Sequence, residues 1–529
     1  MRQATARCNV AARRDVAARR DVVAWQGVLL PDAAVHYLAA MKEQLKRLTT
    51  DSAIYGVSNV VGRFLTFLLV PFYAHTLMKE EYGIVLVVYS YVAFLNAVCT
   101  FGLEPAYMRF VADGDRAQRD RVFTMSVGFV GLASALLAAL LLALQPSAMR
   151  ALEFGDALDA VIPLALAMVL FDAVNVIPFA ALRMERRARY FAGTRIAAIL
   201  INVSLNILFL AVLHWPVTAV FAAGAISSFA TTVILLPVYR DHLRRGYDRA
   251  LLRALLRFGL PTLPGAVSIM MIEVIDKPIM QKLTNYATAA EYGANYKLGI
   301  FMMLVVTMFR YAWQPFYLQL TANAEAKRLF ARVLTYFTLV GAAIVLLLSL
   351  FIADLVRIPL PGGRTLIPAT YWSGLGIVPI ILFSYLWAGI AQILNAGIYI
   401  EKKTMHVLYA TALGAAVNVV CNFALIPMWG LYGGAFATFA AYFTIAGFYA
   451  VAGRRIYPIR YEIPRLLRIG VALAVPALLW YLIPAHTLLP LFVWKLTLVA
   501  VFAAILWFSG FFLDSEIAQL RHLTRRFSR

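Results

Sequence analysis

YGIVLVVYSYVAFLNAVCTFG, residues 82–102, is a run of the chain without one charged side chain. As an α-helix it is long enough to cross the roughly 30 Å hydrocarbon core of a bilayer, which takes about twenty apolar residues. We expect further spans near residues 52–77, 123–144, 158–182, 192–213, 217–238, 258–280, 292–316, 331–354, 374–396, 404–426, 431–451, 467–483 and 489–512. The sequence therefore predicts an all-α polytopic membrane protein with about fourteen transmembrane helices.

The composition agrees with this interpretation. Of 529 residues, 62% are hydrophobic and only 14% are charged, which is far from the usual composition of a soluble domain. The net charge of +21 does not indicate a nucleic-acid partner, because the basic residues are distributed between the apolar spans. The three cysteines, Cys8, Cys99 and Cys421, lie far apart without a CxxC pair, so we expect no metal and no cofactor.

Lys and Arg residues are concentrated in every second loop. The opposite loops hold few of them, namely Lys79, Arg150, Lys277, Lys282, Arg357 and Arg364. Most of the 48 lie in the two terminal tails and in residues 109–121, 183–195, 240–257, 327–332, 402–403 and 454–468. Because basic residues favour cytoplasmic loops, we predict that both termini are cytoplasmic.

The first fifty residues differ from the rest. They contain the repeat AARRDVAARRDV (residues 11–22) and lack the apolar core of a secretory signal. We interpret residues 1–40 as a disordered basic tail or an over-extended start. The segment from Met41 is expected to form a short basic helix on anionic headgroups.

The two halves of the chain resemble each other. A shift of 210 residues aligns Glu81-Tyr82-Gly83 with Glu291-Tyr292-Gly293, and a shift of 216 aligns Asn202 and Asn206 with Asn418 and Asn422. The matched segments lie six spans apart and cross in the same direction, so the repeats are parallel. We expect two six-helix lobes around a central cavity, in residues 51–257 and 258–455, followed by two further helices and a tail in 456–529.

Ionisable side chains inside the hydrocarbon are costly and should face a wet cavity or a partner. Arg63 lies mid-span with no interface in reach, so it either lines the cavity or pairs with Asp172 or Glu273. Lysines near span ends can instead extend to the interface. The candidates are Arg63, Asp172, Glu273, Asp276, Lys277, Lys297, Arg310 and Lys495.

Amides in the spans are candidates for the cavity wall. Asn202 and Asn206, like Asn418 and Asn422, lie four residues apart and share a helix face. The alternative is that these amides only join helices, in contacts worth roughly 1 kcal/mol.

Motifs of catalysis are absent from the sequence. It contains no GxxxxGK[ST], HExxH or GxSxG, and no long loop that would hold an active site. We therefore expect a protein that is not an enzyme, and that is driven by an ion gradient, a substrate gradient or a partner.

Three segments resemble a known family. They are VPFYAHTL with EYG and FGLEPAYMR between residues 70 and 109, LPTLPG to IDKPIM followed by EYGANYKLG between 260 and 299, and NVVCNFALIPMWGLYGGAFAT at 418–438. Together they are similar to Wzx-like polysaccharide and O-antigen flippases of the multidrug/oligosaccharidyl-lipid/polysaccharide (MOP) exporter superfamily. The resemblance covers nearly everything after Met41.

The resemblance implies a flippase of the bacterial inner membrane. Its substrate would be an oligosaccharide on a polyprenyl diphosphate, moved to the outer leaflet for polysaccharide, O-antigen or lipopolysaccharide biosynthesis. Membrane lipids, a polysaccharide polymerase and a chain-length regulator are the implied partners. Two alternatives stay open: a cation-coupled multidrug exporter of the same superfamily, whose cavity should be acidic, and a lipid II flippase.

The resemblance also implies roles for the candidate residues. The diphosphate would be bound by Arg63, Arg310 and Lys297, since Arg can bind a phosphate with two hydrogen bonds. Exchange of H⁺ or Na⁺ falls to Asp172, Glu273 or Asp276. Sugar contacts in the cavity fall to Asn202, Asn206, Asn418 and Asn422.

Cysteine labelling in intact cells tests the orientation. With a thiol reagent that cannot cross the membrane, we expect the Arg364→Cys protein to be labelled and the Arg245→Cys protein to be spared, because only the first position faces outward. The reverse result would overturn the assignment of the basic loops to the cytoplasm.

Overall fold

The computed structural model describes residues 56, 60–112, 114–152, 159–319, 324–483 and 490–513. The tail predicted for residues 1–50, with its short surface helix, lies outside the described residues. All that follows concerns the compact unit Ser58–Arg529.

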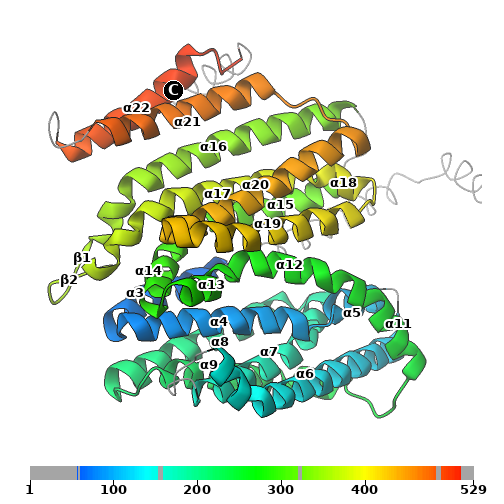
Figure 1. Cartoon of the computed structure of the whole chain (residues 1–529). Helices are drawn as coiled ribbons and strands as arrows, with labels where there is room; N and C mark the ends of the chain where they lie inside the picture. The colour runs from blue at the N-terminus through cyan, green and yellow to red at the C-terminus, as the bar shows by residue number, and fades with distance from the viewer. Residues whose placement is uncertain are drawn as a thin grey trace, which may run out of the picture. The chain divides into compact units, whose positions relative to one another are not determined.

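Apolar runs form helices here because a helix satisfies its own backbone hydrogen bonds where water is absent. The helices form two bundles, seen below and above α12 in Figure 1. The N-terminal lobe consists of α3 (Leu69–Thr76), α4 (Lys79–Cys99), α5 (Leu103–Val111), α6 (Arg116–Leu152), α7 (Val161–Met184), α8 (Ala188–Asn206), the π-helix η3 (Ile207–Val212), α9 (Thr218–Ile234) and α10 (Leu236–His242). The C-terminal lobe consists of α14 (Tyr286–Lys297), α15 (Ile300–Gln319), α16 (Ala324–Val356), the 3₁₀-helix η5 (Ala369–Ile377), α17 (Val378–Leu394), α18 (Ala396–Ile400), α19 (Met405–Trp429) and α20 (Leu431–Ile456).

Two further helices extend the C-terminal lobe. They are α21 (Ile463–Leu482), which packs on α16, and α22 (Leu491–Phe508), which packs on α21. A short antiparallel hairpin of β1 (Pro359–Leu360) and β2 (Arg364–Thr365) follows α16. His75 Nε2 of α3 lies 2.7 Å from the Thr365 carbonyl oxygen, so the hairpin touches the N-terminal lobe.

One broken span links the lobes. Its pieces are α11 (Arg249–Gly259), the 3₁₀-turn η4 (Leu260–Thr262), α12 (Leu263–Val274) and α13 (Asp276–Leu283). The first piece packs on α5 and α6, the second helix lies between α4 and α19, and the third contacts α14. Pro261 and Pro264 lie at the first break, where their missing N–H groups interrupt the helical hydrogen bonds.

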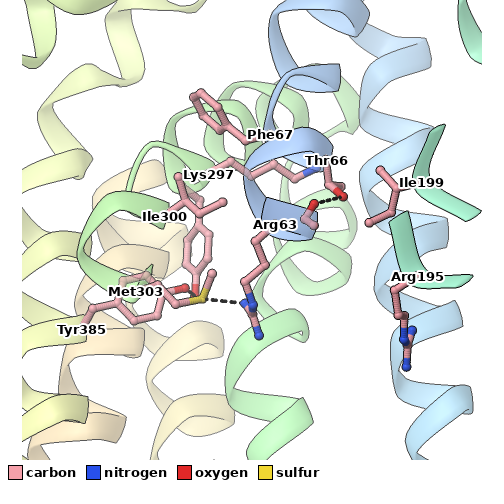
Figure 2. Close-up of a pocket in the computed structure, with 11 residues that line it drawn as sticks. Arg63, Thr66, Phe67, Arg195, Ile199, Lys297, Ile300, Met303 and Tyr385 are labelled. Atoms are coloured by element: carbon pink, nitrogen blue, oxygen red, sulfur yellow. Dashed lines mark hydrogen bonds between the residues drawn. The ribbon is translucent and has the colours of Figure 1, made fainter. Parts of the chain in front are cut away.

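The number of spans agrees approximately with the prediction. Among the described residues, eleven helices are long and apolar enough to cross a membrane, and two pairs bent by 44° and 47° bring the number to thirteen. A shorter apolar helix, Val60–Thr76, occupies the described part of the first predicted span. Figure 2 shows Arg63, Thr66 and Phe67 on this helix. The all-α polytopic fold is confirmed, whereas the exact number of fourteen and the domain bounds stay predictions.

The repeated EYG segments lie where the lobes meet. Helix α4 packs along α14, and the two glycines leave no space for a side chain. A Cβ at Gly83 would lie 2.0 Å from the Tyr286 carbonyl oxygen, and one at Gly293 would lie 2.4 Å from Cδ1 of Leu86. The sequence repeat therefore marks a site of close helix packing.

An ion pair fastens the same contact. Lys79 Nζ, at the start of α4, lies 2.6 Å from Glu291 Oε2 of α14 and donates a hydrogen bond of 3.1 Å to the Thr370 carbonyl oxygen. The Ser373 hydroxyl donates to the other Glu291 oxygen. We call Lys79, Glu291 and Ser373 the latch.

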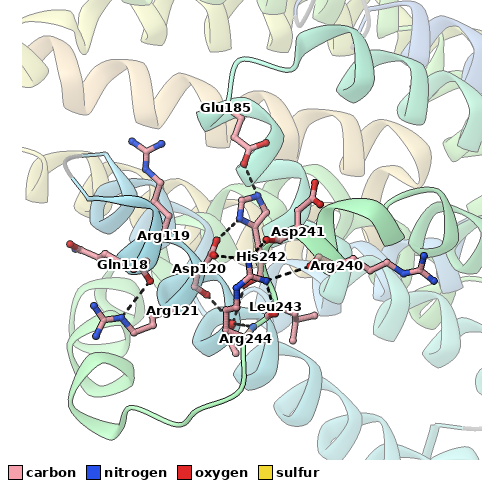
Figure 3. A network of polar contacts seen from close by, with 12 residues as sticks. Gln118, Arg119, Asp120, Arg121, Glu185, Arg240, Asp241, His242, Leu243 and Arg244 are labelled. Carbon is pink, nitrogen blue, oxygen red and sulfur yellow. Dashed lines mark hydrogen bonds and ion pairs between the residues drawn. The ribbon is translucent and has the colours of Figure 1, made fainter.

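A second polar network joins three segments of the N-terminal lobe. His242 ends α10, which is bent by 44° from α9 and lies beyond the predicted span 217–238. Its Nδ1 lies 2.8 Å from Asp120 Oδ1 of α6, and its Nε2 lies 2.6 Å from Glu185 Oε1 in the turn after α7. Figure 3 shows the ring between these two carboxylates. Arg244 contacts the second oxygen of Asp120 at 3.0 Å.

The network depends on the charge of His242. Both ring nitrogens must donate to satisfy two carboxylates, which only imidazolium can do. The hydrogen bond to Glu185, against the opposing effect of burial and with help from Asp120, raises the pKa of His242 above 6.5. The hydrogen bond from His242 likewise lowers the pKa of Glu185 below 4.5.

We expect the stability of the purified protein to fall as the pH rises through the raised pKa of His242. A raised folded-state pKa contributes stability that is complete below the unfolded value of about 6.5 and is lost above the folded value. Thermal unfolding of the wild type and of His242→Gln between pH 5.5 and 8.5 measures this. The melting temperature of the wild type should decrease with pH more steeply than that of the variant, and parallel curves would contradict the assignment.

Candidate functional site

One pocket lies between the lobes and shares lining residues with a second pocket in the N-terminal lobe and a third in the C-terminal lobe. The middle one, of about 440 Å³, receives Arg63 and Arg195 from the N-terminal lobe and Lys297 from the C-terminal lobe (Figure 2). Met303 and Tyr385 form part of its wall, and no carboxylate is among its described lining residues. We call it the basic pocket.

Arg63 is exposed to this pocket, and no described residue forms an ion pair with it. Its Nη1 donates to the Met303 sulfur at 3.0 Å, a weak acceptor. Within the described residues, neither Asp172 nor Glu273 forms an ion pair with Arg63. The sequence-based alternative of a structural pair is therefore not what the structure shows.

Lys297 and Arg195 complete the basic pocket from two other helices. Lys297 is the last residue of α14 and is partly exposed. Arg195 lies on α8, and its guanidinium carbon is 4.1 Å from the ring centroid of Phe179, a cation–π contact that holds the group at the pocket wall.

The position of Arg195 corrects the sequence analysis, which grouped it with the loop residues 183–195. Helix α8 begins at Ala188, so Arg195 lies about two turns inside the helix. The signal was present in the sequence, because the predicted span 192–213 already included Arg195 as an ionisable residue.

The second pocket lies in the N-terminal lobe, has a volume of about 710 Å³ and shares Arg195 and Lys297 with the basic pocket. Asp172 of α7 lines it. Its Oδ1 accepts a hydrogen bond of 2.7 Å from the Ser228 hydroxyl, and its Oδ2 accepts one of 3.2 Å from the Asn96 amide. A carboxylate beside hydroxyl and amide groups offers oxygen ligands to a proton or a hard cation. Among the described residues, no cluster of three His, Cys, Asp or Glu side chains could hold a metal ion.

The third pocket lies in the C-terminal lobe and has a volume of about 410 Å³. Glu273 and Arg310 line it, and Arg63 lines both this pocket and the basic pocket. The structure therefore separates the predicted diphosphate ligands, since Arg310 faces a different pocket from Lys297.

Asp276 lies outside all three pockets. It is fully buried, and its Oδ1 is 2.7 Å from Lys277 Nζ, while the Tyr292 hydroxyl donates to its Oδ2 at 2.7 Å. Lys277 also donates to the Glu273 carbonyl oxygen at 3.0 Å. The sequence analysis counted Lys277 among the outer loops, which is corrected here: it is a buried residue of α13 that is only 6% exposed.

The paired asparagines are mostly internal. Asn202 lines the N-terminal pocket. Asn206 is fully buried, donates to the Asn202 carbonyl oxygen and accepts a hydrogen bond of 2.8 Å from the Tyr73 hydroxyl. Asn418 and Asn422 are fully buried in α19, where the second donates to the first at 2.9 Å, and they line none of the three pockets.

Comparison with solved structures identifies the fold. The chain is similar to the lipid II flippase MurJ in an inward closed conformation, with a TM-score of 0.67 and 13% identity over 86% of this chain and 99% of that one. It is also similar to a multidrug resistance MATE family transporter of the MOP superfamily. The inward-facing form gives a TM-score of 0.59 and 16% identity over 77% of this chain and 96% of that one. The outward-facing form gives a TM-score of 0.56 and 16% identity over 77% of this chain and 95% of that one.

Comparison of sequences identifies the family. No curated protein matches the chain. The model of the family described as polysaccharide biosynthesis protein matches residues 48–321, which is more than half of the chain. The chain belongs to this polysaccharide biosynthesis protein family of the MOP transporter superfamily.

Proposed function

We propose that this protein is a flippase for a polyprenyl-diphosphate-linked oligosaccharide, which it moves from the cytoplasmic to the outer leaflet of a bacterial inner membrane by alternating access. The observation that carries the proposal is the basic pocket, where Arg63, Arg195 and Lys297 converge from both lobes on one space. Delivery to polysaccharide or O-antigen assembly, and work beside a polymerase and a chain-length regulator, belong to the same proposal.

The cost of these charges favours an anionic substrate. A cation near the bilayer centre costs roughly 2.5–3.5 kcal/mol on insertion scales unless water or a partner compensates it. Three cations in one pocket also repel each other. A diphosphate supplies several negative oxygens on a small group, and both guanidinium groups can bind it with paired hydrogen bonds.

The latch supports alternating access. It joins the lobes at the end that carries the β1–β2 hairpin, which is the outer end in the predicted orientation. Because the basic pocket draws residues from both lobes, separation of the lobes at this end would widen the pocket toward the outer leaflet. The latch then closes the pocket during loading and opens for release.

Asp172 supports coupling to an ion. It lines the N-terminal pocket together with Arg195, and the charges of the two groups interact. Exchange of H⁺ or Na⁺ at this carboxylate would change the field at the basic pocket. Glu273 lines the C-terminal pocket, whereas Asp276 forms an ion pair with Lys277.

Two other transport functions are weighed against this one. An exporter of cationic drugs needs an acidic cavity, but each carboxylate in the pockets shares its pocket with at least two basic residues. A lipid II flippase would use the same diphosphate chemistry, and rescue of a strain depleted of its lipid II flippase distinguishes it. Failure of that rescue, with restored surface polysaccharide in a deletion strain, supports the proposal.

Replacement of Arg63 or Arg195 by Ala should abolish surface polysaccharide in a complemented deletion strain while the protein level stays intact. Arg63→Lys should retain part of the function, because it keeps the charge and loses only the paired hydrogen bonds. Arg253→Ala is the matched control, since Arg253 is an exposed residue of α11 that lines none of the three pockets. Polysaccharide levels equal to those of the control would remove the basic pocket from the mechanism.

If the latch closes the basic pocket, reversing the charge of one partner should make the pocket more accessible, and reversing both should restore the closure. In a background without native cysteines, we expect Thr66→Cys in the basic pocket to react faster with an impermeant maleimide, added from the Arg364 side, when Lys79→Glu is present. Like charges at Lys79→Glu and Glu291 repel and open this end, and adding Glu291→Lys should restore slow labelling. Equal rates in all three proteins would show that the ion pair does not close the pocket.

A further inference from the structure

The C-terminal pocket has a chemistry unlike that of the basic pocket. Its wall carries aromatic rings on several helices, and amide, carboxylate and guanidinium groups lie between them. The rings include Tyr311, Trp313, Tyr385, Tyr399, Tyr442 and Tyr449. Flat apolar faces alternating with fixed donors and acceptors suit a ligand that has both C–H faces and many hydroxyl groups.

Several polar groups of this wall have no hydrogen-bond partner within the part of the chain that the structure describes. The side chains of Gln392 and Glu273 are partly exposed and make no hydrogen bond to another described residue. Trp313 is only 4% exposed, and its Nε1 has no acceptor among the described residues. The partly exposed side chains of Gln392 and Glu273 can therefore form hydrogen bonds with a ligand in the pocket.

The pocket also lies next to the basic pocket. Arg63, Met303 and Tyr385 line both. A ligand that places a diphosphate at the Arg63 guanidinium can therefore extend its next group into the C-terminal pocket. In a lipid-linked oligosaccharide that next group is the first sugar.

We propose that the C-terminal pocket is the saccharide subsite of the flippase, with Gln392, Glu273 and Tyr442 as hydrogen-bonding residues. This inference rests on the proposed function. The volume of about 410 Å³ lies in the range of roughly 300–1,000 Å³ that holds small organic ligands. A cationic ligand is disfavoured, because Arg63 and Arg310 lie in the same wall as the single carboxylate Glu273.

Equilibrium binding to the full-length protein in lipid nanodiscs tests the subsite. Two probes are used: the lipid-linked oligosaccharide extracted from a deletion strain, and polyprenyl diphosphate of the same lipid without sugar. We expect the wild type to bind the glycosylated probe at least about tenfold more tightly. Gln392→Ala, Gln392→Leu and Tyr442→Phe should reduce this preference severalfold and leave the affinity for the bare diphosphate unchanged.

Two variants serve as controls. Gln281→Ala changes a glutamine of similar exposure in α13 that lies outside the three pockets, and it should bind both probes as the wild type does. Arg63→Ala should weaken the binding of both probes to the same extent, because it removes a side chain that binds the diphosphate.

The outcomes separate the two proposals. If the wild type binds neither probe, the flippase function fails. If the wild type binds both probes with equal affinity, or if the Gln392 variants lose affinity for both probes, the proposal of a saccharide subsite is wrong while that of a diphosphate site is supported.

Discussion

The close approach of α4 and α14 is the constraint on which the rest of the structure depends. Gly83 fixes this contact by packing, because a Cβ there would collide with the Tyr286 backbone, whereas a Cβ at Gly293 would displace the end of the Leu86 side chain. The latch beside them is different in kind. Its Lys79 and Glu291 side chains are 28% and 12% exposed, and partly exposed ion pairs contribute about 1 kcal/mol or less. Packing therefore sets the geometry of this contact, and in the proposed cycle the weak ion pair would decide whether this end stays closed.

The intramembrane charges fall into two groups. Asp276 with Lys277, and Lys495 with Asp354, are ion pairs in which the lysines are 6% and 2% exposed. Removal of Lys277 would leave the fully buried Asp276 charge without a partner, at a cost of roughly 3–5 kcal/mol, which indicates a structural role. Asp354 is half exposed, so the second pair is buried only on its lysine side. Arg63 faces a pocket, and the hydrogen bond that it forms with another described residue is to a thioether. This difference in partners, which the sequence does not contain, separates structural charges from charges open to a substrate.

Helix length and repeat symmetry could be predicted from the sequence, because apolar runs and repeated segments can be read along the chain without knowing how the helices pack. The exposure of Arg63 to a cavity could be proposed as well, because the residue lies in the middle of a span, far from either membrane interface. The sequence does not show which residue each polar side chain contacts. Asn418 and Asn422 share a helix face, but only the rotation of α19 decides that they face the protein interior and none of the three pockets. Arg195 was missed for the related reason that loop counting ignores where α8 begins.

Arg195 also connects the substrate with the ion in the proposed cycle. It lines both the basic pocket and the N-terminal pocket, so its positive charge lies in the wall that Asp172 also lines. A diphosphate bound at Arg195 would neutralise that charge, so Asp172 would take up a proton or Na⁺ more readily. By thermodynamic linkage, a cation at Asp172 must strengthen diphosphate binding by the same factor. In the proposed cycle, substrate and cation would therefore bind together, unlike in an antiporter in which the two compete for one site.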